Sequence, residues 1–189
     1  IREIKEHAKA ILYAWFPGTE GGHAIADILY GDRNPQARLS MSLPWCVSQV
    51  PVFYGEFRTG RHVEDGEQIE NRFMSRYTDI PNRPLYPFGY GLSYTDFVYG
   101  GLQISSETLP KNGELTVSVT VTNKGNYDGY ETVQLYLRDI YAEVARPMKE
   151  LKGFERIFLK SGESRDVKFV ITKDDLKFYN SELHYVYEP

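Results

Sequence analysis

The sequence is poor in cysteine: Cys46 is the single cysteine among 189 residues. A lone cysteine excludes an internal disulfide, and we interpret it as a buried thiol. The four histidines, His7, His23, His62 and His184, are too scattered to match the spacing of metal ligands. A metal site is therefore not expected.

Two further absences exclude whole classes of partner. Lysine and arginine total 22 against 26 acidic residues, so the net charge is −4 and no basic patch indicates nucleic-acid binding. No apolar run approaches the roughly 18–20 residues that a membrane-spanning helix needs. The first residues match neither a signal peptide nor an initiator sequence, which suggests that the chain belongs to a longer protein.

The hydrophobic pattern of the first half of the chain predicts part of an α/β layered domain. Apolar residues at helical spacing predict a short helix at the start, and residues 11–16 form the continuous apolar run typical of a buried parallel strand. A second helix is expected over about residues 21–30, stopped by Gly31 and Pro35. Since one buried strand cannot form a sheet alone, this helix-strand-helix pattern predicts an incomplete α/β sandwich domain over residues 1–97.

A long loop is expected at about residues 53–87. We interpret its acidic side chains as solvated surface rather than as acid/base catalysts; they are Glu64, Asp65, Glu67 and Glu70. The glycines that follow imitate two catalytic signatures. Tyr94 stands where a dinucleotide fingerprint needs its last glycine, and Thr95 replaces the second glycine of a nucleophile elbow. Both patterns are interpreted as tight turns.

From residue 98 to residue 189 the pattern is that of an all-β domain. Apolar and polar residues alternate strictly over residues 115–122 and again over residues 132–137 and 167–171. Turn-forming residues separate these runs, which predicts an antiparallel sandwich of immunoglobulin or fibronectin type III-like shape. Thr172 and Asp175 are placed to form a capping box at a single helical turn.

The end of this predicted sandwich is short of strands. Beyond residue 171 only the stretches around Phe178 and residues 184–187 are candidates, whereas such a sandwich has about seven strands. We therefore expect the last strand to be missing. An uncovered edge of that kind favours self-association, so a homo-oligomer is a possible state of the protein.

Taken together, these motifs resemble glycoside hydrolase family 3, and within it the bacterial periplasmic-type β-glucosidases. Three segments are similar to the family's second, α/β domain, and three to the fibronectin type III-like domain that follows it. The segments are residues 10–22, 24–32 and 85–97 for the first domain, and residues 121–123, 133–137 and 146–155 for the second.

The resemblance implies a retaining mechanism with two carboxylates, acting on β-glucosides or short β-linked oligosaccharides without a cofactor. It places the nucleophile on a barrel domain, and the acid/base ahead of residue 1, so no catalytic residue is assigned here and the isolated chain is expected to be inactive. Arg58-Thr59-Gly60-Arg61 resembles a loop on the face turned to the barrel. Arg61 is therefore the one candidate for substrate binding, with a surface arginine as the alternative.

The β-sandwich is expected to brace the catalytic domains. The alternative is a carbohydrate- or protein-binding module without a catalytic role, for which Tyr127, Tyr130 and Tyr141 are the candidate platform. The resemblance leaves open the preference for glucosides over xylosides, and it leaves open a cytoplasmic or a periplasmic location in a bacterium.

Overall fold

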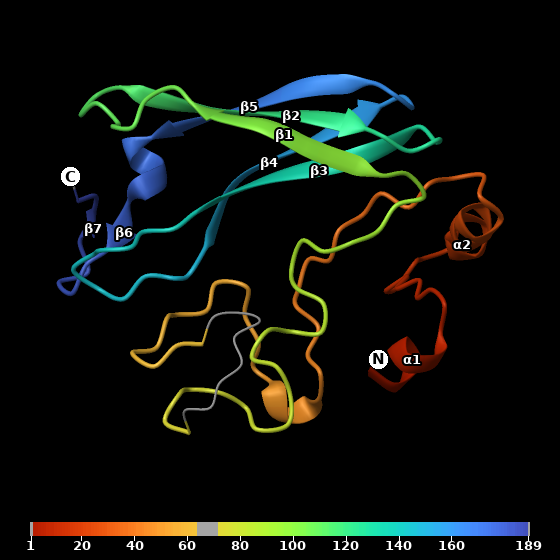
Figure 1. Ribbon diagram of the computed structural model, residues 1–189, viewed down its shortest axis with the longest axis horizontal. Coiled ribbons are helices and arrows are strands. Elements are labelled where there is room, and N and C mark those ends of the chain that lie inside the picture. Colours follow the sequence, from red (N-terminus) through yellow and green to blue (C-terminus); the bar gives the residue numbers. More distant parts are fainter. Residues whose placement is uncertain (1, 64–71, 189) are drawn as a thin grey trace. The chain divides into compact units, whose positions relative to one another are not determined.

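The computed structural model describes residues 2–63 and 72–188 (Figure 1). The chain separates into two compact units. The first unit comprises Ile1–Tyr54 and Thr59–Leu92, and the second comprises Gly55–Arg58 and Ser93–Pro189.

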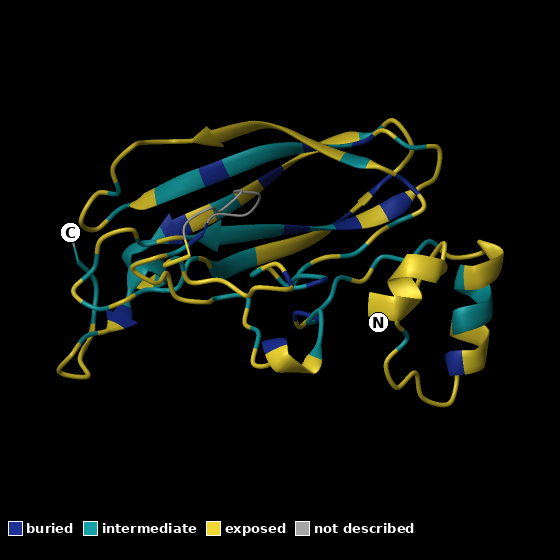
Figure 2. Cartoon of the chain, turned by 60° about the horizontal axis from the view of Figure 1, so that its bottom comes forward, coloured by how far each residue is buried: buried dark blue, intermediate teal, exposed yellow. Residues whose placement is uncertain are grey.

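The described part of the first unit contains two α-helices, α1 (Arg2–His7) and α2 (Gly21–Tyr30), and a 3₁₀ turn, η1 (Val47–Gln49). Helix α1 is exposed along its whole length (Figure 2). Helix α2 ends at Gly31, whose left-handed backbone (φ 85°) lets its N–H group bond to the carbonyl of Ile28. The helix predicted over residues 21–30 and its stop at Gly31 are confirmed.

The strand expected over residues 11–16 is wrong. No described strand pairs with this segment, and its large side chains are exposed, Phe16 completely. A strand needs a neighbour for its N–H and C=O groups, and none of the described residues supplies one. The positive φ of Trp15 (51°) also interrupts an extended backbone. The fold class is confirmed only as a small helical remnant followed by a β-sandwich.

The rest of the first unit is held by hydrogen bonds between distant loops. Buried Gln49 donates from Nε2 to the carbonyl of Pro81 at 3.2 Å, and the backbone N–H of Leu43 donates to Tyr86 at 2.8 Å. A Cβ atom on Gly91 would lie 2.7 Å from the carbonyl oxygen of Ala37, so this glycine allows a close backbone approach. No helix or strand forms among the described residues between 53 and 87; the long loop expected over this range stays a prediction.

The second unit holds the strands of the sandwich. They are β1 (Phe97–Ile104), β2 (Glu114–Asn123), β3 (Gly129–Leu137), β4 (Glu150–Leu159), β5 (Ser164–Thr172), β6 (Phe178–Tyr179) and β7 (Tyr185–Val186). One sheet has the order β1-β2-β5 and lies over a second sheet, β3-β4; β6 and β7 form a separate pair (Figure 1). Every pairing is antiparallel. The predicted alternation is confirmed in β2, β3 and β5.

The core of the sandwich lies between these two sheets. It consists of the aliphatic residues that the alternation directs inward, all at most 2% exposed: Val121, Val133, Ile157, Leu159 and Val167. Burial of such side chains contributes about 25 cal/mol per Å² of apolar area, which makes this cluster the main stabilising element of the unit. Beside it lies an open hollow of about 440 Å³, lined by residues of β1, β2, β3 and β5.

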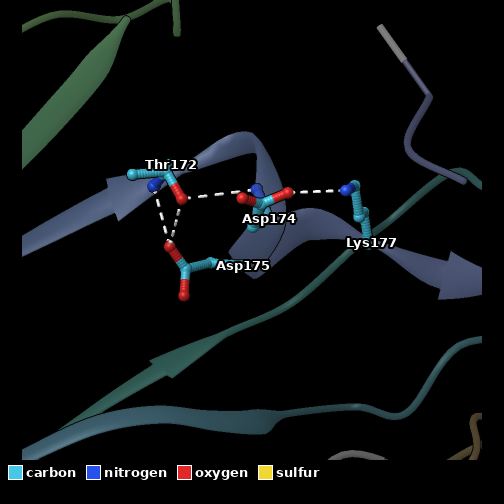
Figure 3. A network of polar contacts seen from close by, with 4 residues as sticks. All are labelled: Thr172, Asp174, Asp175 and Lys177. Carbon is cyan, nitrogen blue, oxygen red and sulfur yellow. Dashed lines mark hydrogen bonds and ion pairs between the residues drawn. The ribbon is translucent and has the colours of Figure 1, made fainter.

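The end of β5 turns through the predicted capping box (Figure 3). The side chain of Thr172 accepts a hydrogen bond from the N–H of Asp174, and the carboxylate of Asp175 accepts one from the N–H of Thr172 at 2.8 Å. Lys177 Nζ lies 2.6 Å from the Asp174 carboxylate, which lowers the pKa of Asp174 and raises that of Lys177. The 3₁₀ helix η2 (Lys173–Leu176) follows, so the capped turn is confirmed.

Strand β3 pairs with β4 and with no other strand of the described residues. The expected absence of a last strand is not tested by this arrangement and stays a prediction, as does the self-association that would follow from it.

Candidate functional site

Arg146, in the segment that leads into β4, is the centre of a partly buried group, here called the Arg146 cluster: Arg146, Glu150, Lys152 and the ring of Phe178. The side chain of Arg146 is only 8% exposed; its Nη2 forms an ion pair with Glu150 Oε1. Its guanidinium carbon lies 4.4 Å from the centre of the Phe178 ring. Lys152 Nζ is 3.0 Å from the other carboxylate oxygen of Glu150. The guanidinium is thus fixed on two sides.

The electrostatics of the cluster favour an ionised Glu150. Burial disfavours the charge and by itself would raise the pKa of Glu150, but hydrogen bonds from Lys152 and Arg146 and their positive charges outweigh it. The pKa of Glu150 therefore lies below its ordinary value. Within the described residues, Arg146 Nε is buried without a hydrogen-bond partner. Such a nitrogen carries a desolvation cost that no hydrogen bond offsets.

Next to this cluster lies a short piece of chain that is distant in sequence, here called the loop stem: Gly55–Arg58. Phe57 forms an isolated antiparallel bridge with Pro147. The N–H of Met148 donates to the carbonyl of Glu56 at 2.7 Å. Residues 55–58 therefore belong to the β-sandwich unit, although the sequence predicts them to lie in the long loop of the preceding domain.

Arg61 follows the loop stem after two residues. Its side chain is exposed, and its Nη1 donates to the carbonyl of Phe73 at 3.3 Å. Its own carbonyl accepts a hydrogen bond from the N–H of Ser75 at 2.9 Å, and the N–H of His62 donates to Thr59. These contacts hold Arg61 in a closed turn. Its proposed contact with substrate is not tested by them. The acidic residues at 64, 65, 67 and 70 lie outside the described residues.

A second polar centre ties the sandwich together around Asn123, which is fully buried. Its Oδ1 accepts a hydrogen bond from the Thr95 hydroxyl at 2.6 Å and from the N–H of Gly125 at 3.1 Å. Its Nδ2 donates to the carbonyls of Tyr127 at 2.7 Å and Leu159 at 3.2 Å. One side chain thus joins β2, β4, the turn between β2 and β3, and the segment that precedes β1.

The tyrosines proposed as a sugar platform do not form one row. Tyr127 lies in the turn before β3 and Tyr130 lies at the start of β3, whereas Tyr141 lies beyond the end of the strand. Nine residues of strand span about 30 Å. Tyr130 also packs against Phe158, and the Arg156 guanidinium carbon lies 4.2 Å from its ring centre. These contacts disfavour a flat aromatic surface.

Three other features of the described residues bear on function: possible metal ligands, helix length and the single cysteine. Among residues 2–63 and 72–188, no three His, Cys, Asp or Glu side chains are grouped so that they could hold a metal. Neither α1 nor α2 has the length and apolarity needed to cross a bilayer. Cys46 is partly buried and in contact with Ser48 at 3.0 Å, in agreement with a structural thiol.

Sequence reasoning missed the Arg146 cluster and the loop stem. Arg146 and Glu150 are four residues apart, a spacing that signals an ion pair only on a helix, and here the chain is not helical. The bridge from Phe57 to Pro147 joins residues 90 positions apart without a local motif. The one available signal is the charged segment 146–155, which carries a family resemblance but does not by itself indicate these contacts.

Comparison with known proteins supports both halves of the chain. Residues 1–94 match the glycosyl hydrolase family 3 C-terminal domain, and residues 131–189 match the fibronectin type III-like domain. A periplasmic β-glucosidase of Salmonella typhimurium is 49% identical over 97% of this chain and 24% of its own length. A β-xylosidase of Formosa agariphila is 43% identical over 100% of the chain and 25% of its own length.

Solved structures give the same result. A mutant β-glucosidase from Listeria innocua in complex with laminaribiose has a TM-score of 0.89 and 45% identity, over 99% of this chain and 26% of that one. A β-glucosidase from Erythrobacter marinus has a TM-score of 0.87 and 40% identity, over 98% of this chain and 23% of that one.

The chain spans about a quarter of the length of these relatives. The two matched domains follow each other in the order expected from the sequence, and together they account for most of its residues. The chain therefore belongs to glycoside hydrolase family 3, of which it is a C-terminal part: residues 1–94 match the C-terminal domain and residues 131–189 the fibronectin type III-like domain.

Proposed function

We propose that this chain is the non-catalytic C-terminal part of a retaining β-glucosidase, which hydrolyses terminal β-D-glucosyl residues of glycosides and short oligosaccharides. The observation that carries the proposal is the 45% identity, at a TM-score of 0.89, to a β-glucosidase crystallised with laminaribiose. Retaining hydrolysis needs a nucleophile and an acid/base about 5–5.5 Å apart. We place both carboxylates outside these 189 residues.

Within such an enzyme, the sandwich acts as a brace and Arg61 as a contact for the bound sugar. Support for the brace comes from the loop stem, which is hydrogen-bonded to the sandwich and leads after two residues into Arg61. Support for Arg61 comes from its exposed guanidinium, whose five N–H donors suit sugar hydroxyls or a neighbouring carboxylate.

The proposal is tested by comparing the complete protein with this chain on chromogenic aryl β-glucosides and β-xylosides. We expect the complete protein to turn over the glucoside in preference to the xyloside. The isolated chain should show no turnover, because accelerations of about 10⁶-fold or more do not survive the loss of both carboxylates. Activity of the repurified chain within about a hundredfold of the complete protein would refute this division of labour.

A carbohydrate-binding module is the second candidate, and the Tyr127, Tyr130 and Tyr141 geometry argues against it. Calorimetric titration of the isolated chain with laminaribiose distinguishes the two functions. A brace gives no heat of binding at millimolar sugar, whereas saturable binding that is lost on replacing Tyr127 would favour the module.

A further inference from the structure

The Arg146 cluster is an expensive arrangement for a small β-sandwich. Moving a guanidinium out of water costs several kcal/mol, and apolar residues of similar size often stabilise a fold as well or better. In this pair the Arg146 side chain is 8% exposed, whereas the Glu150 side chain is 24% exposed. Here the cost is larger still, because Arg146 Nε is buried without a partner among the described residues. Stability alone does not account for such a group, whereas fixing one backbone conformation does.

What the cluster fixes is the short segment from Arg146 to Met148. The Arg146 side chain is held by the Glu150 carboxylate, at the first residue of β4, and by the face of the Phe178 ring in β6. Phe178 is itself buried, at 6% exposed. Arg146 is thereby tied to two strands, and the residues next to it cannot shift without breaking the ion pair or the ring contact.

This same segment is what the loop stem pairs with. Pro147 bridges Phe57, and the Met148 N–H donates to the Glu56 carbonyl at 2.7 Å. Proline has a fixed φ and no N–H group, so Met148 supplies the donor and Pro147 stiffens the backbone that presents it. The position of residues 55–58 therefore depends on that of Arg146.

We propose that Arg146 is a positioning residue: by fixing Pro147 and Met148 it holds the loop stem, and so determines where Arg61 meets the sugar. The inference rests on the proposed function, since it needs a sugar site for Arg61 to face. Only Thr59 and Gly60 separate the stem from Arg61, so a displaced stem shifts one end of the turn that holds Arg61. Misplacement by about 1 Å is enough to impair a site substantially.

The test replaces Arg146 by methionine, which keeps the apolar stem over Phe178 and removes the charge. Arg156→Met is the matched control, because Arg156 also lies over an aromatic ring of this sandwich, at 4.2 Å from Tyr130, but does not belong to the cluster. Hydrogen exchange of the Met148 amide is followed by NMR in this chain, and KM and kcat for an aryl β-glucoside are measured in the complete protein.

We expect Arg146→Met to speed exchange at Met148 and to raise KM by about 3- to 30-fold, with kcat changed less than about twofold. Arg156→Met should do neither. A merely structural role would lower thermal stability and leave KM unchanged, and that result overturns the proposal. Equal effects of both variants on KM overturn it as well.

Two other outcomes also decide the question. If Arg146→Met does not fold, Glu150→Gln replaces it, because the amide keeps the shape and removes the ion pair; an unchanged Met148 exchange and KM in that variant refute the proposal. If the wild-type complete protein hydrolyses no β-glycoside, the proposed function fails. Exchange at Met148 then decides on its own whether Arg146 holds the loop stem.

Discussion

Replacing Asn123 by alanine should destabilise the sandwich far more than replacing an exposed polar residue of the same strand. The change removes an acceptor and two donors from a fully buried position. It leaves the Thr95 hydroxyl and the Leu159 carbonyl in the interior without this partner. A buried polar group that loses its partner costs about 1–3 kcal/mol, so two such groups give a loss of about 2–6 kcal/mol. A domain is stable by only about 5–15 kcal/mol.

Urea unfolding of this chain, followed by far-UV circular dichroism, measures that loss. With a slope of about 2 kcal/mol per M, in the middle of the usual range of about 1–3, the sandwich transition of Asn123→Ala should move down by about 1–3 M. Thr122→Ala is the control, because its hydroxyl is hydrogen-bonded to that of Ser164 at an exposed position, and it should cost less than about 1 kcal/mol.

A double-mutant cycle with Thr95→Val makes the test stricter. Since the two side chains share the 2.6 Å hydrogen bond, their effects should fail to add by about 0.5–3 kcal/mol. If Asn123→Ala costs no more than Thr122→Ala, or if the cycle is additive, the account of Asn123 as the polar centre of the sandwich is refuted.

Other substitutions test other parts of the structure. Gly125→Ala places a Cβ atom 2.7 Å from the backbone nitrogen of Asp96 and should lower the free energy of unfolding in denaturant by about 2–4 kcal/mol. In Gly100→Ala the added Cβ meets nothing within 4 Å, so the free energy of unfolding should not change. Equal losses in the two variants would contradict this. The pKa of Glu150 is lower in the folded than in the unfolded chain. The ionised carboxylate therefore stabilises the fold at a pH above its ordinary pKa of about 4.3, and this contribution is lost as the pH falls through the pKa of the folded chain. The stability difference between wild type and Glu150→Gln should therefore shrink between pH 7 and pH 3, and a constant difference would disprove the linkage. Chymotrypsin should cut after Leu12, Tyr13 or Trp15, which are 41–48% exposed and lie outside the described helices and strands, before it cuts at Phe178, which is 6% exposed; mass spectra showing the reverse order would contradict this.

Local periodicity is sufficient to predict the sandwich strands. In β2, β3 and β5 the alternation of apolar and polar residues is itself the cause of the two-sided sheet, so the pattern and the structure have one origin. The same holds for the capped turn at Thr172, which depends on residues three positions apart. Segment 11–16 shows the limit, because an apolar run becomes a strand only when another strand lies beside it.

The polar centres cannot be predicted in the same way. The residues around Asn123 indicate a turn, which is present, but the partners of its side chain at Thr95 and Leu159 are 28 and 36 positions away. Arg61 is a candidate only through a family resemblance, and the loop stem that precedes it belongs to a different unit of the chain. Contacts of this kind depend on tertiary packing rather than on a local pattern.

The pairing of β2 with β5 has a consequence for how the protein is made. Thr122 faces Ser164, and Glu114 faces Thr172, so 42 residues or more separate each partner from the other. At a synthesis rate of about 5–20 residues per second, β2 leaves the ribosome roughly 2–12 seconds before its neighbour. During that interval β1 can already cover one side of β2, while the side meant for β5 stays available to chaperones and to other nascent chains.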